Sequence, residues 1–178
     1  MKRPFALAMV VGLIVALAVP AFANGKIREA SGTTTFTLNP QCTPGVDCAI
    51  DPETGVLTIP LLNPATKSGT FKGTQVLTAD FLLNTTDGSF VMTGTVVFNG
   101  RVKACGVGTV VFDAYGEGFL DETGTAVFEV NSETVNAAGT TLPISGQLNS
   151  PGALPTDPDT GVGSAPYSGE YACDHSRN

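Results

Sequence analysis

The chain has 178 residues, with 16 acidic side chains against nine Lys and Arg, so its net charge is −7. An acidic balance disfavours nucleic acid and anionic membrane surfaces as partners, because both bind proteins through cations that neutralise phosphate. The single histidine, His175, is the fourth residue from the end. A zinc centre and a mechanism based on a Ser-His or Cys-His pair are therefore not expected, and we expect no cofactor.

The first residues have the three parts of a secretory signal. Positions 2 and 3 are basic, positions 5–19 are apolar, and Ala21-Phe22-Ala23 has the small residues that signal peptidase recognises before its cleavage site. The apolar core is shorter than the ~20 residues that a membrane-spanning helix needs. We expect cleavage between Ala23 and Asn24, and an uncleaved anchor helix is the alternative.

Cleavage leaves residues 24–178, which have the length of one domain. Seven basic residues then face the 16 acidic ones, a net charge of −9 that favours a soluble protein. We expect a single β domain, a disordered tail at 174–178, and no stable membrane anchoring. The expected location is the periplasm or the outside of the cell.

Period-two alternation of apolar and polar residues predicts the strands. They lie near 31–38, 55–61, 69–83, 89–98, 101–115, 118–130, 139–149 and 165–173. Asn99-Gly100 predicts a type I′ hairpin, and Asp87-Gly88 and 121–124 predict two further turns. Strands with one apolar and one polar face are typical of antiparallel sheets.

About eight meandering strands with small residues on their inner face predict one all-β domain, a closed antiparallel barrel. Closure removes the exposed sheet edges that would otherwise pair with other chains. Glycines at 94, 106, 108 and 146 fit strongly coiled strands. A two-sheet β-sandwich is the alternative, and no helix is expected after the signal.

All four cysteines follow the signal, which indicates two disulfides formed in an oxidising compartment. Pro44-Gly45 can turn the chain so that Cys42 meets Cys48, which leaves Cys105 for Cys173. Four cysteines allow two other pairings as well. Cys173 also shares a strand face with two tyrosines, so the second bridge requires either an outward-facing tyrosine face or a twisted strand end.

Residues 51–56 and 157–162 are near copies, D-P-E-T-G-V and D-P-D-T-G-V, and each predicts a reverse turn. Asp157 and Asp159 are the only candidates for a calcium site. Because the EF-hand spacing and its closing Glu are absent, we expect turns and no metal.

No nucleophile elbow, H-E-x-x-H pair or phosphate-binding glycine loop is present. Glu117 lies between two glycines and close to Tyr115, so a barrel interior would make this pair a candidate general acid/base. Asp80 is a similar candidate. The alternative for all three residues is a solvent-facing position on a strand.

Four segments of the C-terminal half resemble uncharacterised secreted bacterial proteins of the allene oxide cyclase and dirigent type. They are G-R-V-K-A-C-G-V-G-T-V-V-F (100–112), E-V-N-S (129–132), I-S-G-Q-L (144–148) and Y-S-G-E-Y-A-C (167–173). The resemblance covers roughly residues 70–173 and implies an eight-stranded barrel. No catalytic residue of the plant cyclases has a match, so no activity is carried over.

The expected function is that of a secreted, non-catalytic β-barrel module that binds a small apolar ligand in the barrel or a protein partner on its rim. One alternative is a barrel enzyme of isomerase or cyclase type that uses Glu117 or Asp80 with Tyr115. The other is a structural, self-associating surface protein. The sequence itself does not indicate an oligomeric state.

Overall fold

The fold was determined from a computed structural model that describes residues 25–44 and 46–174. The expected signal peptide (1–23), its cleavage site at Ala23 and Asn24, and the tail from His175 onward lie outside the described residues. Asp174 is described, and its backbone N–H donates to the carbonyl of Pro143 at 2.7 Å. The described residues contain no helix that could cross a lipid bilayer.

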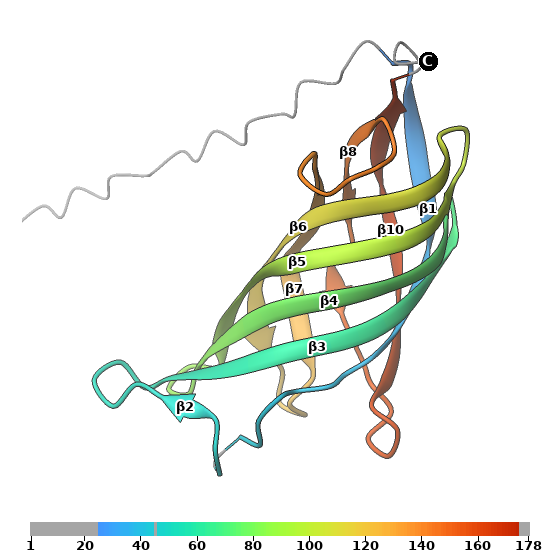
Figure 1. The fold of residues 1–178 in the computed structure, drawn as a ribbon. Helices are drawn as coiled ribbons and strands as arrows, with labels where there is room; N and C mark the ends of the chain where they lie inside the picture. Colours follow the sequence, from blue (N-terminus) through green and yellow to red (C-terminus); the bar gives the residue numbers. More distant parts are fainter. Residues whose placement is uncertain (1–24, 45, 175–178) are drawn as a thin grey trace, which may run out of the picture.

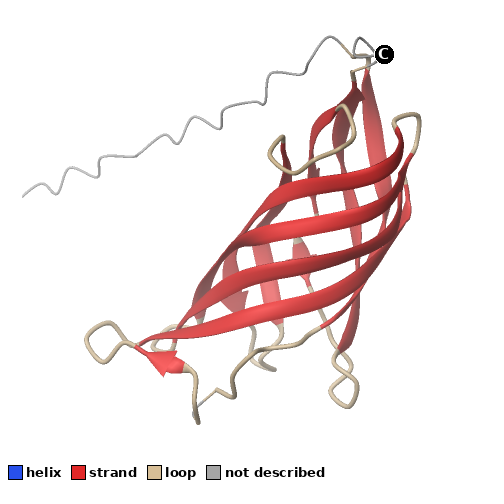
Figure 2. Ribbon diagram, in the orientation of Figure 1, coloured by secondary structure: helices blue, strands red, loops and turns tan. Residues whose placement is uncertain are grey.

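The described residues form ten strands and no helix (Figures 1 and 2). The strands are β1 (Ile27–Thr37), β2 (Ala49–Ile50), β3 (Val56–Gly69), β4 (Phe71–Asn84), β5 (Ser89–Val102), β6 (Gly106–Leu120), β7 (Ala126–Asn136), β8 (Ile144–Asn149), β9 (Gly152–Ala153) and β10 (Val162–Cys173).

Eight of these strands close into an antiparallel barrel in the order β1-β10-β8-β7-β6-β5-β4-β3. The closing pair is β1 with β3, from Gly32 opposite Gly69 to Phe36 opposite Ala65. The short strands β2 and β9 add to β3 and β7. The predicted barrel is confirmed, and the sandwich alternative is excluded because all strands of the described residues belong to one closed sheet.

The alternation that predicted β5 sets its inner face. Phe90, Met92, Val96, Phe98 and Val102 are buried, Gly94 and Gly100 lie on the same face, and the odd-numbered residues between them are exposed. Side chains of a strand point to opposite sides in turn, so a closed sheet places one set in the lumen and the other in solvent.

Asn99-Gly100 does not form the predicted hairpin, and this prediction is wrong. β5 runs through both residues to Val102, and the turn follows at residues 103–105, where Ala104 has φ +66°. Gly100 instead permits a close approach of neighbouring strands, since a Cβ there would lie 2.4 Å from the carbonyl oxygen of Lys72. The next strand is therefore β6 at 106–120, not 101–115.

β3 is also longer than predicted and reaches Gly69, whereas the expectation ended near residue 61. Two prolines, Pro60 and Pro64, lie inside the longer strand. β4 pairs with β3 along its length, but β1 joins the other side only from Ala65 onward. Prolines are tolerated where one side of a strand has no ladder partner.

Both predicted disulfides are present, Cys42–Cys48 and Cys105–Cys173. Tyr167 and Tyr171 point inward and are almost fully buried, so the tyrosine face does not turn outward. Cys105 instead belongs to the turn after β5, which brings it to the last residue of β10. Two disulfides are compatible with an extracellular or periplasmic location.

The two ends of the barrel differ in how they are filled. At the end that holds Cys105–Cys173, five aromatic rings pack together with Val102, Val110 and Leu148. The five rings are Phe71, Phe98, Phe112, Tyr167 and Tyr171, and Phe71 contacts each of the other four, with centroids 5.6–6.2 Å apart. This half is closed, and the opposite half is hollow.

Candidate functional site

The hollow half of the barrel contains a cavity of about 630 Å³. This volume lies within the range of ~300–1,000 Å³ that is usual for small-molecule sites. Its lining comes from the inner faces of barrel strands and from the loops at the end of the barrel that holds β2 (Figure 1).

Three connections form the mouth of the cavity. The segment between β1 and β3 contributes Leu38, Pro40 and Pro44, and the β6–β7 turn contributes residues 123–125. The long connection between β8 and β10 contributes Leu154, Thr156 and Pro158. The mouth is thus made of loops, which can differ in composition without changing the barrel.

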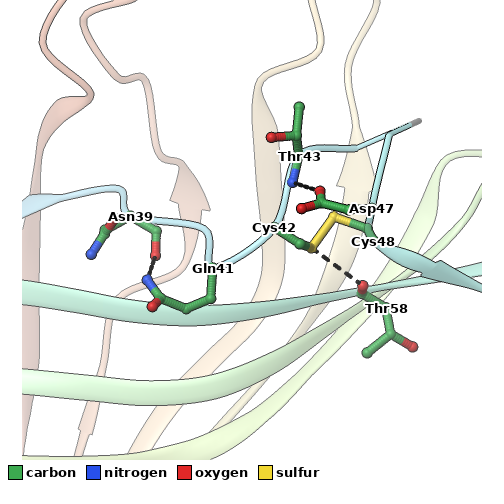
Figure 3. The surroundings of a disulfide bond; sticks show 7 residues. All are labelled: Asn39, Gln41, Cys42, Thr43, Asp47, Cys48 and Thr58. Atoms are coloured by element: carbon green, nitrogen blue, oxygen red, sulfur yellow. Dashed lines mark hydrogen bonds between the residues drawn. A yellow bond between two sulfur atoms is a disulfide. The ribbon is translucent and has the colours of Figure 1, made fainter.

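The first of these connections is held by the disulfide Cys42–Cys48 (Figure 3). Within the loop, the Thr43 N–H donates to the Asp47 carboxylate at 2.5 Å. Asn39 anchors the segment before it, because its backbone N–H donates to Oδ1 of Asn63 on β3 at 2.7 Å. These contacts place Pro44 at the mouth.

The walls between mouth and floor are apolar. β3 contributes Leu57, Ile59 and Leu61, and the other strands add Leu77, Phe81, Leu83, Met92, Leu120 and Phe128. Phe81 and Phe90 lie with ring centroids 4.5 Å apart, and Phe90 contacts Phe128 at 4.8 Å. Such walls favour an apolar occupant, since its burial removes apolar surface from water.

The floor is polar, and an ion pair crosses it. Lys67 on β3 donates to Oε2 of Glu133 on β7. Three strands separate β3 from β7 in either direction around the barrel, so the pair spans the lumen. The Lys67 side chain is 1% exposed and that of Glu133 is 18% exposed, and only Glu133 lines the cavity.

Aromatic rings support the Lys67 ammonium from the closed half. Its nitrogen lies 4.9 Å from the Tyr167 ring centroid and 5.5 Å from that of Phe112, which are cation–π distances. The Tyr167 hydroxyl accepts the N–H of Phe71 and donates to the carbonyl of Ser68, both at 2.9 Å. Burial raises the pKa of Tyr167 above its ordinary value of 10.0.

Four uncharged polar residues on the barrel strands also line the cavity: Thr34, Asn63, Gln75 and Asn131. Gln75 is 6% exposed, and its Oε1 is buried without a hydrogen-bond partner. Gln75 is on β4, and its partner on β5 is Phe98, one of the five packed aromatic residues. Gln75 therefore marks the boundary between the closed and hollow halves.

The acid/base candidates predicted from sequence do not reach this cavity. The Tyr115 hydroxyl donates to Glu117 at 2.6 Å, so the two side chains do meet, but on the outer face of β6. The solvent-facing position stated as the alternative is the one observed for this pair, because Val110, Phe112 and Ala114 occupy the inner face. Asp80 is exposed and pairs with the exposed residues Pro60 and Thr93.

The two aspartate-proline segments form matching turns. Asp157 Oδ1 accepts the backbone N–H groups of Asp159 and Thr160 at 2.9 Å, and Asp51 accepts those of Glu53 and Thr54 in the same way. The bond from Thr160 is the main reason that the pKa of Asp157 is lowered. The predicted turns are therefore present, with the Asp157 carboxylate used inside its own turn.

Sequence reasoning missed the floor residues. Period-two alternation from Phe128 places Val130 inside and Asn131 outside, and the structure reverses both. The cause is a β-bulge: Gly118 pairs with Phe128 and Glu117 with Val130, so Glu129 is an extra residue on β7. The shifted phase carries Glu133 into the lumen.

Comparison with protein-family models, with curated proteins and with solved structures found no match to this chain.

Proposed function

We propose that this protein is a secreted or periplasmic, non-catalytic module that binds a small apolar molecule inside its barrel. The observation that carries the proposal is the cavity of about 630 Å³, which has apolar walls and a floor closed by packed side chains. A concave apolar site with a few convergent polar groups is the usual form of a small-molecule site.

Binding is favoured over catalysis because the only acid in the lining, among the described residues, is Glu133. Its carboxylate is paired with Lys67, so its charge is already compensated. The Tyr115–Glu117 pair, which an enzyme would need inside, lies on the outer face. An eight-stranded barrel is also what the resemblance to allene oxide cyclase and dirigent proteins implies, but a fold by itself transfers no activity.

Secretion is supported by the N-terminal sequence pattern and by the two disulfides, which persist in oxidising compartments. Fractionation of producing cells followed by N-terminal sequencing tests this part. The expected result is a soluble protein that begins at Asn24. Recovery of the chain in the membrane with residues 1–23 still attached would contradict it.

The binding proposal is tested by titrating the mature protein with N-phenylnaphthylamine, an apolar dye whose fluorescence rises in apolar sites. Ala114→Phe adds a ring to the cavity wall and is expected to weaken dye binding at least tenfold. The matched control is Thr95→Phe, which adds the same ring on the exposed face of β5. Equal dye affinity in the two variants would contradict the proposal.

A further inference from the structure

The cavity has its polar groups at one end and its apolar groups along its length. Leu57, Leu83 and Leu120 line it near the mouth, where β3 begins and where β4 and β6 end. Gln75 and Glu133 lie at the deep end, next to the Lys67 side chain that crosses the lumen and to the five packed aromatic rings. An occupant that matches this arrangement has one polar end and an apolar body, with the polar end inward.

The deep end contains an unused polar group. Gln75 is 94% buried, and its Oε1 accepts no hydrogen bond. A buried carbonyl oxygen without a donor is costly, so native proteins rarely leave one unless something else completes it. A half-turn of the amide presents either its acceptor or its two donors, so the complementary group is one that can both donate and accept.

Charge selects among such groups. Glu133 is the only charged residue among the described residues of the lining, and Lys67 compensates it from behind. An anionic head would meet the carboxylate without reaching the ammonium, since the Lys67 side chain is 1% exposed. A cationic head would leave one positive charge uncompensated between apolar walls. Both arrangements are unfavourable compared with a neutral head.

Resting on the proposed function, we infer that the ligand is a neutral amphiphile with a hydroxyl head, bound with the hydroxyl at the Gln75–Glu133 floor and the apolar body toward the mouth. The hydroxyl donates to one acceptor of the floor and accepts from an amide N–H. Free fatty acids and alkyl amines are the poorer ligands in this assignment.

The test is displacement of N-phenylnaphthylamine from the mature protein by three ten-carbon compounds: decanol, decanoate and decylammonium. We expect decanol to displace the dye at about tenfold lower concentration than either charged compound, the effect of about one hydrogen bond to a buried group. Decanoate or decylammonium displacing the dye as well as decanol does would overturn the inference while leaving the proposed function intact. Absence of dye binding to the wild-type protein would overturn both.

A pair of identical substitutions tests the role of the floor. Gln75→Leu removes the amide whose Oε1 has no partner and is expected to weaken displacement by decanol about tenfold, the effect of about one hydrogen bond, with dye affinity retained. Gln147→Leu makes the same change on the outer face of β8 and is expected to leave displacement by decanol unchanged. If decanol displaces the dye from Gln75→Leu as well as from the wild-type protein, the assignment of the hydroxyl to this floor is wrong. The comparison of the three compounds on the wild-type protein tests the inference without any variant.

Discussion

The side chains of Lys67 on β3 and Glu133 on β7 meet across the lumen, although these strands lie on opposite sides of the barrel. On one side of the pair are the rings of Phe112 and Tyr167, and on the other is the cavity. The pair therefore divides the barrel into a solid half that stabilises the fold and a hollow half that is free to accommodate a ligand.

Removing one member of this pair should destabilise the protein strongly. Lys67→Met leaves the Glu133 carboxylate without its counter-ion, at an expected cost of about 3 kcal/mol in unfolding free energy. This is the lower end for a buried pair, because the Glu133 side chain is 18% exposed to the cavity. Urea unfolding measures the loss.

Two further variants check that charge is the cause. Lys67→Met combined with Glu133→Leu should recover most of the stability, since no uncompensated charge remains. Lys72→Met, on the exposed face of β4, should change the unfolding free energy by no more than about 0.5 kcal/mol. A double variant as unstable as Lys67→Met would show that packing, not charge, accounts for the effect.

The Tyr167 hydroxyl is expected to stabilise the closed half. Tyr167→Phe leaves the N–H of Phe71 and the carbonyl of Ser68 without this partner in a buried site. The expected loss is about 1–3 kcal/mol in denaturant unfolding. Tyr115→Phe is the control, because its hydroxyl bonds Glu117 on the exposed face and should contribute less than about 0.5 kcal/mol.

Stability should fall at alkaline pH because of two buried phenols, Tyr167 and Tyr171. Burial raises the pKa of both phenols above 10.0, so they stay protonated in the folded state at pH values where the unfolded chain has lost these protons. The unfolded state then binds fewer protons, and the free energy of unfolding decreases as pH rises past about 10. Below that pH the contribution is constant.

Unfolding midpoints measured across pH 8–12 would show this decline, where the range is set by the ordinary tyrosine pKa of about 10. Tyr167→Phe should make it shallower. Tyr115→Phe should change it less, because Tyr115 is 40% exposed and its pKa is raised mainly by the hydrogen bond to Glu117 rather than by burial. A decline of equal steepness in the wild type and in Tyr167→Phe would argue against burial of this phenol as its cause.

The two disulfides should differ in how much they stabilise the chain. Cys105–Cys173 closes a loop with a sequence separation of 68, and Cys42–Cys48 one of only 6. Loop-closure entropy then predicts a loss of about 4 kcal/mol for the paired Ser variant of the first and about 2 kcal/mol for the second. Thermal unfolding of both double variants under non-reducing conditions measures the difference. A larger loss for the short loop would contradict the entropic account.

Much of the fold is readable from local sequence. The alternation from Phe90 to Phe98 defines β5, and Asp87-Gly88 and 121–124 are the turns on either side of the β5–β6 pair. The spacing of Cys42 and Cys48 around Pro44 determines their pairing and leaves the other two cysteines for each other. These features depend on neighbouring residues only, so strand periodicity, turn chemistry and loop length are sufficient to predict them.

The candidate site depended on contacts between distant segments. The bulge at Glu129 exists only in the pairing of β7 with β6, and it reverses which side of β7 faces inward. Without the bulge, period-two alternation places Glu133 on the outer face of its strand. Lys67 falls in a loop between two predicted strands. Asn99-Gly100 fails as a turn for the same reason, because β4 and β6 pair with β5 beyond it.

The sequence by itself therefore determined an all-β chain with two disulfides and a count of about eight strands, since these follow from short-range patterns. Tertiary structure alone decided the closure of β1 onto β3, the crossing of the lumen by Lys67 and Glu133, and the burial of Gln75. The physical reason is that a period-two strand has only two faces. Which of them becomes the inside is set by strand register and bulges, and these depend on partners far along the chain.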